Sequence, residues 1–266
     1  MITEREWSLR IPTFEEIAKD FSDNQANLFL NTLPSSSAIL RNLKYAIEEP
    51  EDRKEIIYIF TTFHNILAEN GLLDDRPKDC MIGTSRLAFN LEGDCLKVAW
   101  NRRGILQNRS EIDILETCTG YSCFPRLIHV FDDNPIAYLT EYCDPFNTED
   151  LGIRNFEIDY MAQFFNILED NEFSLPLTKQ ELERNRKDMP RNYVELLGDM
   201  IEGKESTRTF RDLVDFFRKN PGRRDLMIDT GIPENWGCAK RNGLSLPIYL
   251  DLGFSKETRK MYESPW

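Results

Sequence analysis

The stretch Asp225–Phe254, DLMIDTGIPENWGCAKRNGLSLPIYLDLGF, combines apolar runs with acidic and amide side chains. The pattern predicts two short apolar strands with Asp229, Asn235 and Asp251 around them, and Asp251 directly follows the apolar run Pro247–Leu250. Carboxylate and amide oxygens are the ligands that a hard cation such as Mg²⁺ prefers, and such ions commonly bridge phosphates. These three side chains therefore indicate a magnesium site that receives a phosphorylated ligand.

A lysine in an apolar strand extends this interpretation upstream. Lys97 lies in Cys95–Trp100, which follows an apolar run at 87–91 and the hairpin signal Gly93-Asp94. A lysine and a magnesium site in one chain are typical of a nucleoside triphosphate site.

The order of predicted elements indicates an α+β protein. Residues 1–78 have helical patterns, with a capping-box start at Thr13–Glu16 and a helix that ends at Asn70-Gly71. Five strands follow, interrupted by a helix predicted over 107–117; the last two strands are expected at 126–131 and 136–142. Beyond a break at Asp144-Pro145, residues 155–220 are predicted to be mostly helical.

Composition limits the possible partners. The net charge of −13 over 266 residues is not expected in a protein that binds nucleic acid directly, because such binding depends on Lys and Arg. No apolar run is long enough for a signal peptide or a membrane span, which predicts a cytoplasmic protein. The spacing of Cys118, Cys123 and His129 does not match a structural zinc site, and the six cysteines are expected to be buried thiols.

Several short motifs, in their order, resemble the protein-kinase-like fold. They are Arg86-Leu-Ala-Phe, Leu96-Lys-Val-Ala, Asn108-x-x-Glu-Ile, Glu234-Asn-Trp-Gly and Leu250-Asp-x-Gly. The chain is similar over residues 80–256 to divergent kinase-like proteins encoded by bacteriophages and bacteria. The resemblance implies two lobes: a helical N-terminal extension at 1–78, a small five-stranded lobe at 79–143 and a reduced, mostly helical lobe at 144–266, with the nucleotide between the lobes.

The resemblance also implies roles for residues of the small lobe. Gly83 and Ser85 would belong to the loop that covers the nucleotide phosphates, and Lys97 would pair with the first two phosphates. A carboxylate on the following helix would hold Lys97. Glu111, fourteen residues after the lysine, is the expected partner, and Glu116, nineteen residues after it, is the alternative.

The remaining implied roles lie in the hinge and the second lobe. The backbone of Glu141 to Cys143 would bind adenine. Asp229 would accept the proton of the phosphate acceptor, with Asp225 as a rival, while Asn235 and Asp251 would bind Mg²⁺. The chain departs from the kinase pattern, since Asp229 and Asn235 are six residues apart and only thirteen residues follow Gly253. A standard protein kinase, which holds a peptide on a large helical platform, is therefore not expected.

Two classes of function follow from this resemblance. The first is an ATP- and magnesium-dependent phosphotransferase acting on a protein or small-molecule hydroxyl. The second is a pseudokinase or a structural or inhibitory bacteriophage protein without catalysis, located in the host cytoplasm or the virion. A protein partner with a basic surface would suit the acidic charge of the chain. Transfer of a nucleotidyl group is a third possibility.

Overall fold

A computed structural model describes the greater part of the chain. It covers residues 9–20, 50–72, 80–91, 93–131, 135–145, 164–165, 168–169 and 191–253. The chain divides into two compact units, here called unit 1 (Met1–Ile112 and Leu127–Tyr142) and unit 2 (Asp113–Arg126 and Cys143–Trp266). Both contain helices and strands, which confirms the α+β class. Within the described ranges, no helix is both long and apolar enough to cross a membrane.

Unit 1 contains a five-stranded antiparallel sheet. Its strands are β1 (Cys80–Ile82), β2 (Arg86–Leu91), β3 (Asp94–Ala99), β4 (Leu127–Val130) and β5 (Ala137–Glu141), in the order β1-β2-β3-β5-β4. These are the strands predicted from sequence, with ends shifted by a few residues. The predicted turn between β2 and β3 contains Gly93 at φ 111°, a backbone conformation that favours glycine.

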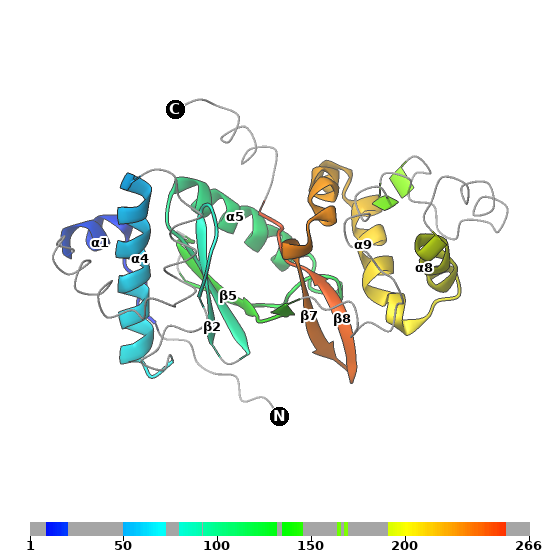
Figure 1. Ribbon diagram of the computed structural model, residues 1–266, viewed down its shortest axis with the longest axis horizontal. Helices are drawn as coiled ribbons and strands as arrows, with labels where there is room; N and C mark the ends of the chain where they lie inside the picture. Colours follow the sequence, from blue (N-terminus) through cyan, green and yellow to red (C-terminus); the bar gives the residue numbers. More distant parts are fainter. Residues whose placement is uncertain are drawn as a thin grey trace. The chain divides into compact units, whose positions relative to one another are not determined.

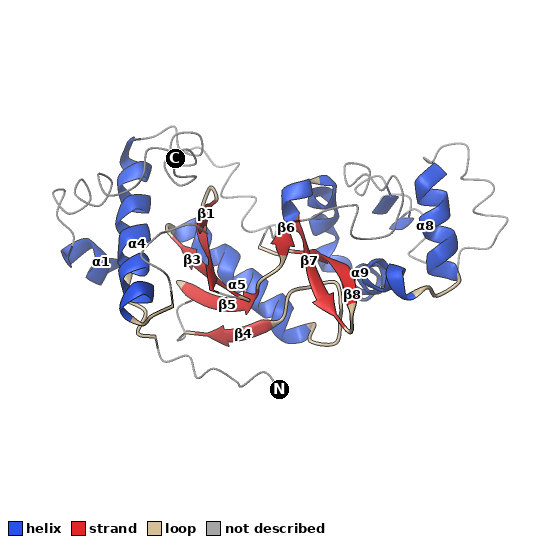
Figure 2. Cartoon of the chain, turned by 60° about the horizontal axis from the view of Figure 1, so that its bottom comes forward, coloured by secondary structure: helices blue, strands red, loops and turns tan. Residues whose placement is uncertain are grey.

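Alternation along the strands gives this sheet two different faces. One face carries apolar side chains that pack against helices α1 (Phe14–Asp20) and α4 (Pro50–Glu69), and this core includes Ile56, Phe60, Phe63, Leu87, Phe89, Leu96 and Val98. The opposite face is covered by helix α5 (Arg102–Thr117), so the sheet lies between α4 and α5 (Figures 1 and 2). The described N-terminal helices are therefore part of the unit 1 core.

The helix ends follow the sequence signals. Thr13 and Glu16 form the predicted capping box, in which the Glu16 N–H donates to Thr13 Oγ1 and the Thr13 N–H donates to Glu16 Oε2. Helix α4 ends as predicted before Gly71, whose φ is 67°. Helix α5 starts five residues earlier than predicted, because Asn101 Oδ1 accepts the Gly104 N–H at 2.9 Å and caps the first turn.

Unit 2 is built on a hairpin supported by helices. Strands β6 (Asp144–Pro145), β7 (Trp236–Arg241) and β8 (Leu244–Tyr249) form an antiparallel sheet. Helix α9 (Arg208–Lys219) buries several phenylalanines, and helix α8 (Arg191–Ile201) packs against α9 (Figure 1). Short 3₁₀ helices span Glu205–Thr207, Pro221–Gly231 and Pro233–Asn235.

One aromatic contact and one buried arginine hold this unit together. The rings of Phe124 and Phe216 meet edge to face at a centroid distance of 4.9 Å. The Arg241 guanidinium, which is buried, donates to the carbonyl oxygens of Ser122 and Phe124 at 2.7 Å each. Arg241 thereby attaches the segment after α5 to the β7–β8 hairpin, and this explains why residues 113–126 belong to unit 2.

Some predicted elements lie outside the described residues. They are residues 21–49 and 73–79 of the predicted N-terminal helical region, most of residues 155–190 of the second helical region, and the residues after Gly253. In the described part of the predicted helical region, residues 191–220, helices α8 and α9 are present as expected.

Candidate functional site

A cluster of three charged side chains lies on the α5-facing side of the unit 1 sheet. Arg86 comes from β2, Lys97 from β3 and Glu111 from α5, and we call them the Glu111 cluster. The Arg86 Nη1 atom donates to Glu111 Oε2 at 2.6 Å, and Lys97 Nζ donates to the other carboxylate oxygen, Oε1. Glu111 is completely buried, while the side chains of Lys97 and Arg86 remain 13% and 15% exposed. The carboxylate is thus held by two cationic side chains, and a small part of each side chain remains exposed to solvent.

The two cations determine the protonation state of Glu111. Burial alone would raise the pKa of its carboxyl group, but the charges of Lys97 and Arg86 and their hydrogen bonds outweigh burial and lower that pKa below its ordinary value. Glu111 is therefore ionised at neutral pH. Burial, together with the nearby Glu111 carboxylate, raises the pKa of the Tyr138 hydroxyl well above its ordinary value, so this neighbour stays neutral.

The predicted partner of Lys97 is present in the structure. Glu111 forms the ion pair with Lys97, whereas the alternative partner, Glu116, is exposed near the end of α5. The strand register explains the position of Lys97, since it lies between Ala88 of β2 and Tyr138 of β5. Its Nζ atom is 6.0 Å from the centre of the Tyr138 ring. A catalytic role for this pair remains a prediction.

Close packing of α5 on the sheet brings Glu111 to the two cations. A Cβ atom at Gly104 would lie 2.2 Å from the Ser85 carbonyl oxygen and 2.9 Å from Ala99 Cβ, so only glycine fits there. One turn further along α5, Gln107 Oε1 accepts a hydrogen bond from the Ser85 hydroxyl. Asn108 Nδ2, also on α5, donates to the carbonyl oxygens of Pro135 and Ile136 at 2.9 and 3.0 Å.

The predicted phosphate loop is a tight turn between β1 and β2. The Gly83 N–H donates to the Arg86 carbonyl oxygen at 2.8 Å, and the Gly83 carbonyl oxygen accepts the indole N–H of Trp100. The Ser85 side chain is buried against Gln107. The structure therefore places the Gly83 amide and the Ser85 hydroxyl in hydrogen bonds within unit 1.

The predicted hinge begins where β5 ends. Glu141 pairs with Asp94 at the end of the sheet, and the Tyr142 N–H donates to the Gly93 carbonyl oxygen at 2.9 Å. Cys143 is buried in a small apolar cluster of unit 2 with Ala239, Leu246 and Ile248. Glu141 and Cys143 thus belong to different units, and their proposed contact with adenine remains a prediction.

The predicted metal ligands lie together at one end of the β7–β8 hairpin. Trp236 pairs with Tyr249, and the Leu250 N–H donates to the Asn235 carbonyl oxygen at 2.8 Å, so Asn235 and Asp251 stand beside the same end of the ladder. Both side chains are partly exposed. Asp251 Oδ1 accepts the Gly253 N–H at 3.3 Å, which turns the chain directly after the strand.

Asp229 is brought to this end of the hairpin by a backbone contact. The Asn235 side-chain amide nitrogen donates to the Asp229 carbonyl oxygen at 3.1 Å, and the amide oxygen is a possible metal ligand. The Trp236 indole N–H donates to the Thr230 carbonyl oxygen at 2.8 Å and fixes the same loop. The rival residue, Asp225, lies earlier in the Pro221–Gly231 3₁₀ helix.

The two predicted metal ligands at this end, Asn235 and Asp251, offer oxygen donors, one amide oxygen and one carboxylate. Such a set suits Mg²⁺, which also keeps several water ligands. Among the residues that the structure describes, no group of three or more His, Cys, Asp or Glu side chains could hold a metal ion by itself. A magnesium ion here would therefore need ligand oxygens from a bound phosphate or from water.

Sequence reasoning missed several residues that shape these sites. Arg86 was assigned only to a motif, although its position on β2, two residues before Ala88, places it on the same sheet face as Lys97. The contacts of Ser85 with Gln107, and of Arg241 with the loop after α5, had no recognisable sequence signal. Such contacts join residues 22 and more than 100 positions apart.

Comparison with known proteins found no relative of the chain. No family model, no curated protein and no solved structure matches the chain.

Proposed function

We propose that the chain is a kinase-like protein that binds ATP and Mg²⁺ and transfers a phosphoryl group to a hydroxyl. The observation that carries this proposal is the Lys97–Glu111 ion pair, in which a lysine of the third strand is held by a buried carboxylate of the next helix. An ammonium group held in this way is a fixed positive charge for the first two phosphates of a nucleotide.

The end of the β7–β8 hairpin supports the magnesium part of the proposal. Asn235 precedes the hairpin, Asp251 follows it, and hydrogen bonds of the ladder bring them to the same end. In this proposal their oxygens bind Mg²⁺, and Asp229 accepts the proton of the acceptor hydroxyl. The protein then contributes alignment and charge neutralisation rather than covalent chemistry.

Thermal unfolding with ATP, with Mg²⁺ and with both together tests this function. Ligand at about one hundred times its dissociation constant stabilises the folded state by about 2.7 kcal/mol. We expect this stabilisation only when ATP and Mg²⁺ are both present. Asp251→Asn should abolish the contribution of Mg²⁺, whereas Glu234→Gln, an exposed neighbour of Asn235, should retain it. Formation of ADP, lost in Asp229→Asn, would demonstrate turnover.

A non-catalytic function is the second candidate, and two observations favour it. Glu111 is shared between Lys97 and Arg86, as in a structural ion cluster, and the Gly83 amide is bonded within its own turn. A chain of this kind would act by binding a protein partner. ATP with Mg²⁺ that leaves the melting temperature unchanged would favour this second candidate, and binding without ADP formation would indicate a pseudokinase.

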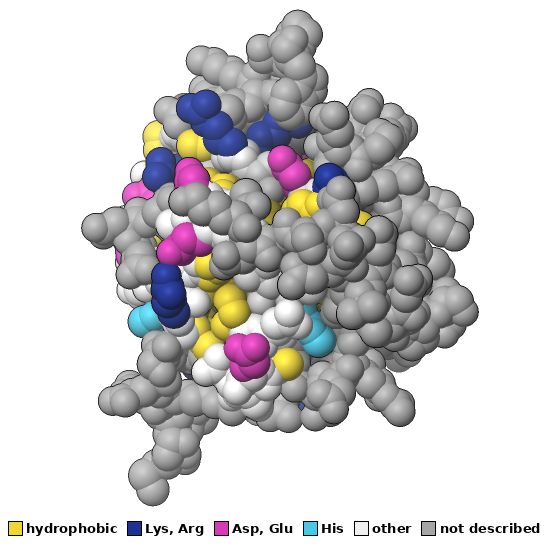
Figure 3. Space-filling view, turned by 90° about the vertical axis from the view of Figure 1, so that its left-hand side faces the viewer, with side chains coloured by type: hydrophobic (Ala, Val, Ile, Leu, Met, Phe, Trp, Pro, Cys, Tyr) yellow, Lys and Arg dark blue, Asp and Glu magenta, His cyan; other side chains and the backbone are white. Residues whose placement is uncertain are grey.

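The surface around α1 and α4 bears on the partner of such a protein. Figure 3 shows that the described side chains on this side include acidic, basic and apolar groups next to one another. A basic partner is therefore proposed from the net charge of −13 and not from a single acidic patch on this side. Binding to an immobilised partner that weakens steeply with salt would support the electrostatic origin.

A further inference from the structure

Unit 1 contains a pocket that the proposed nucleotide function does not use, and we call it the pocket beside Trp100. Its volume is about 470 Å³, which lies within the range of roughly 300–1,000 Å³ that is typical of small-molecule sites. Four segments line it: α1, α4, the residues directly after β3 and the first turn of α5. None of the described residues that line it belongs to the Glu111 cluster or to the β7–β8 hairpin. Binding to this pocket can therefore be tested separately from the binding of a nucleotide.

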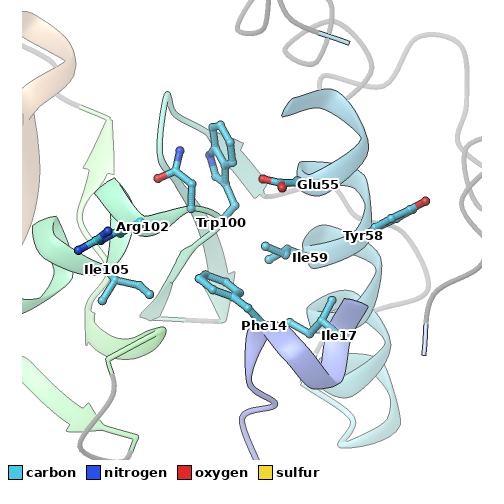
Figure 4. A pocket seen from close by; sticks show the side chains of 9 residues that line it. Phe14, Ile17, Glu55, Tyr58, Ile59, Trp100, Arg102 and Ile105 are labelled. Carbon is cyan, nitrogen blue, oxygen red and sulfur yellow. The ribbon is translucent and has the colours of Figure 1, made fainter. Parts of the chain in front are cut away.

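Isoleucine and phenylalanine side chains form the apolar part of the lining. Phe14 from α1 and Ile59 from α4 point into the space (Figure 4). Ile17 and Ile59 belong to the buried core of unit 1, whereas Phe14 and Ile105 pack against that core and are only partly buried. The pocket therefore lies at the margin of the core. A ligand in this position would remove the remaining exposed surface of Phe14 and Ile105 from water, which favours binding.

The polar residues around the pocket are engaged elsewhere in the protein or directed away from the space. The Trp100 indole N–H donates to a carbonyl oxygen of the β1–β2 turn at 3.2 Å, and Asn101 Oδ1 accepts a backbone N–H of α5 at 2.9 Å. Glu55 already has an interaction within the chain. The guanidinium of Arg102 points away from α4, and the Tyr58 ring points out of the pocket (Figure 4). The lining therefore offers apolar contact rather than a charge with which a ligand could pair.

We propose that the pocket beside Trp100 binds a small uncharged molecule with an apolar body, such as a substituted benzene. The body contacts Phe14, Ile59 and Ile105, which come from three different helices. A charge of either sign on the ligand weakens binding, because the charged group loses hydration in the pocket without a partner that compensates for the loss. Apolar contact and the size of the space, rather than ion pairing, therefore select the ligand.

A titration with three matched probes tests the proposal on the full chain. Toluene is uncharged, benzylamine adds a positive charge to the same benzyl body at neutral pH, and phenylacetate adds a negative charge. The signal is the δ1-methyl resonance of Ile59, assigned by its loss in Ile59→Val, because a bound aromatic ring shifts the resonances of nearby methyl groups. We expect a saturable shift with a dissociation constant of about 1 mM for toluene and roughly tenfold weaker binding of both charged probes.

Two tryptophan substitutions on α5 distinguish the pocket from the rest of the helix surface. Ile105→Trp fills the space and should abolish the shift of the Ile59 methyl resonance with toluene. Leu106→Trp introduces the same ring at a partly buried neighbouring position outside the lining and should leave the affinity for toluene unchanged. The melting temperature of each variant without ligand shows whether its fold is retained. The comparison of the three probes on the unmodified chain depends on neither variant.

The proposal is overturned by any of three results. The first is the absence of a saturable shift at toluene concentrations about five times the expected constant. The second is benzylamine or phenylacetate binding as tightly as toluene. The third is an affinity for toluene that a folded Ile105→Trp variant retains. A preference for toluene over both charged probes, with toluene binding lost in Ile105→Trp and kept in Leu106→Trp, supports the proposal, whatever the outcome with ATP.

Discussion

The two places where this chain gathers polar side chains are arranged in opposite ways. In the Glu111 cluster, a fully buried carboxylate is bound by Lys97 and Arg86, so its charge is matched inside the protein. At the end of the β7–β8 hairpin, Asn235 and Asp251 are partly exposed and are positioned mainly by backbone hydrogen bonds. We expect the first arrangement to be needed for the stability of unit 1 and the second to tolerate changed side chains at little cost in stability.

Because of this difference, we expect the Glu111 cluster and the end of the β7–β8 hairpin to respond differently to substitution. A buried ion cluster couples function to folding, because removing one member leaves the other charges without compensation in a region of low polarity. Side chains at a partly exposed strand end are nearly independent of the core, so their loss should affect ligand binding alone. Each of the following substitutions tests one side of this contrast.

The largest expected effect is that of Glu111→Gln. The change leaves Lys97 and Arg86 facing a neutral amide, and breaking a buried pair in this way costs about 3–5 kcal/mol in the free energy of unfolding. Urea denaturation followed by circular dichroism measures it. Glu116→Gln, on the exposed side of the same helix, should stay close to the wild type. Equal stability of the two variants would contradict a structural role for the cluster.

The same carboxylate predicts a dependence of stability on pH. Because the folded protein holds the pKa of Glu111 below its ordinary value of 4.5, its contribution is fully present above the unfolded-state pKa. That contribution is lost as the pH falls below 4.5 toward the folded-state pKa. Glu111→Gln should therefore lose less stability than the wild type between pH 6 and about pH 3. Parallel pH profiles for the two proteins would exclude this assignment.

In unit 2 the matching substitution is Arg241→Met. It leaves the carbonyl oxygens of Ser122 and Phe124 buried without their donors, at a cost of about 3 kcal/mol in the free energy of unfolding. Lys240→Met, at the exposed neighbouring position, should change stability by less than about 0.5 kcal/mol. Denaturant titration compares the two variants, and a small effect of Arg241→Met would show that water replaces the guanidinium.

Two glycines in helices should respond to alanine with opposite signs. Gly104→Ala places a Cβ atom against the Ser85 carbonyl oxygen and should destabilise the protein by about 1–3 kcal/mol. Gly198→Ala in α8, where the space is open, should stabilise it by roughly 0.5–1 kcal/mol through higher helix propensity. The melting temperatures of both variants test these opposite signs. An unchanged melting temperature for Gly104→Ala would mean that α5 can move away from the sheet.

The smallest expected effect on stability is that of Asp251→Asn. The substitution keeps the size of the side chain and an oxygen that can accept the Gly253 N–H, so stability without ligand should change by less than about 0.5 kcal/mol. Thermal unfolding without Mg²⁺ or nucleotide measures this. A loss as large as that of Glu111→Gln would show that the end of the hairpin has a structural role comparable to that of the Glu111 cluster.

Much of the described fold could be predicted because its signals are local. Alternating apolar residues specify β2 and β3, Thr13 and Glu16 form the predicted cap, and Asn70-Gly71 ends α4 where expected. Only the predicted start of α5 missed by more than a few residues. Its first turn contains Arg102, Arg103 and Gly104, which weaken the apolar period, and the Asn101 cap was not recognised.

The candidate sites were predicted less completely, for a physical reason. Sequence spacing proposed the Lys97–Glu111 pair, and the structure contains it, but the second cation on Glu111 could not be predicted from spacing. Arg86 and Glu111 are 25 residues apart and meet only because Gly104 lets α5 approach the sheet closely. The pocket beside Trp100 depends on four separate elements, so no single stretch of sequence indicates it.

The two-residue turn at Asn242 and Gly243, with φ of 53° and 79°, makes the hairpin intolerant of changes in length. Because the turn sets the register in which Trp236 pairs with Tyr249, inserting one residue between Gly243 and Leu250 would shift Asp251 by one position relative to Asn235. Deleting one residue would do the same. Substitutions along both strands can be absorbed locally, but the number of residues between Asn235 and Asp251 has to stay constant for these side chains to act together.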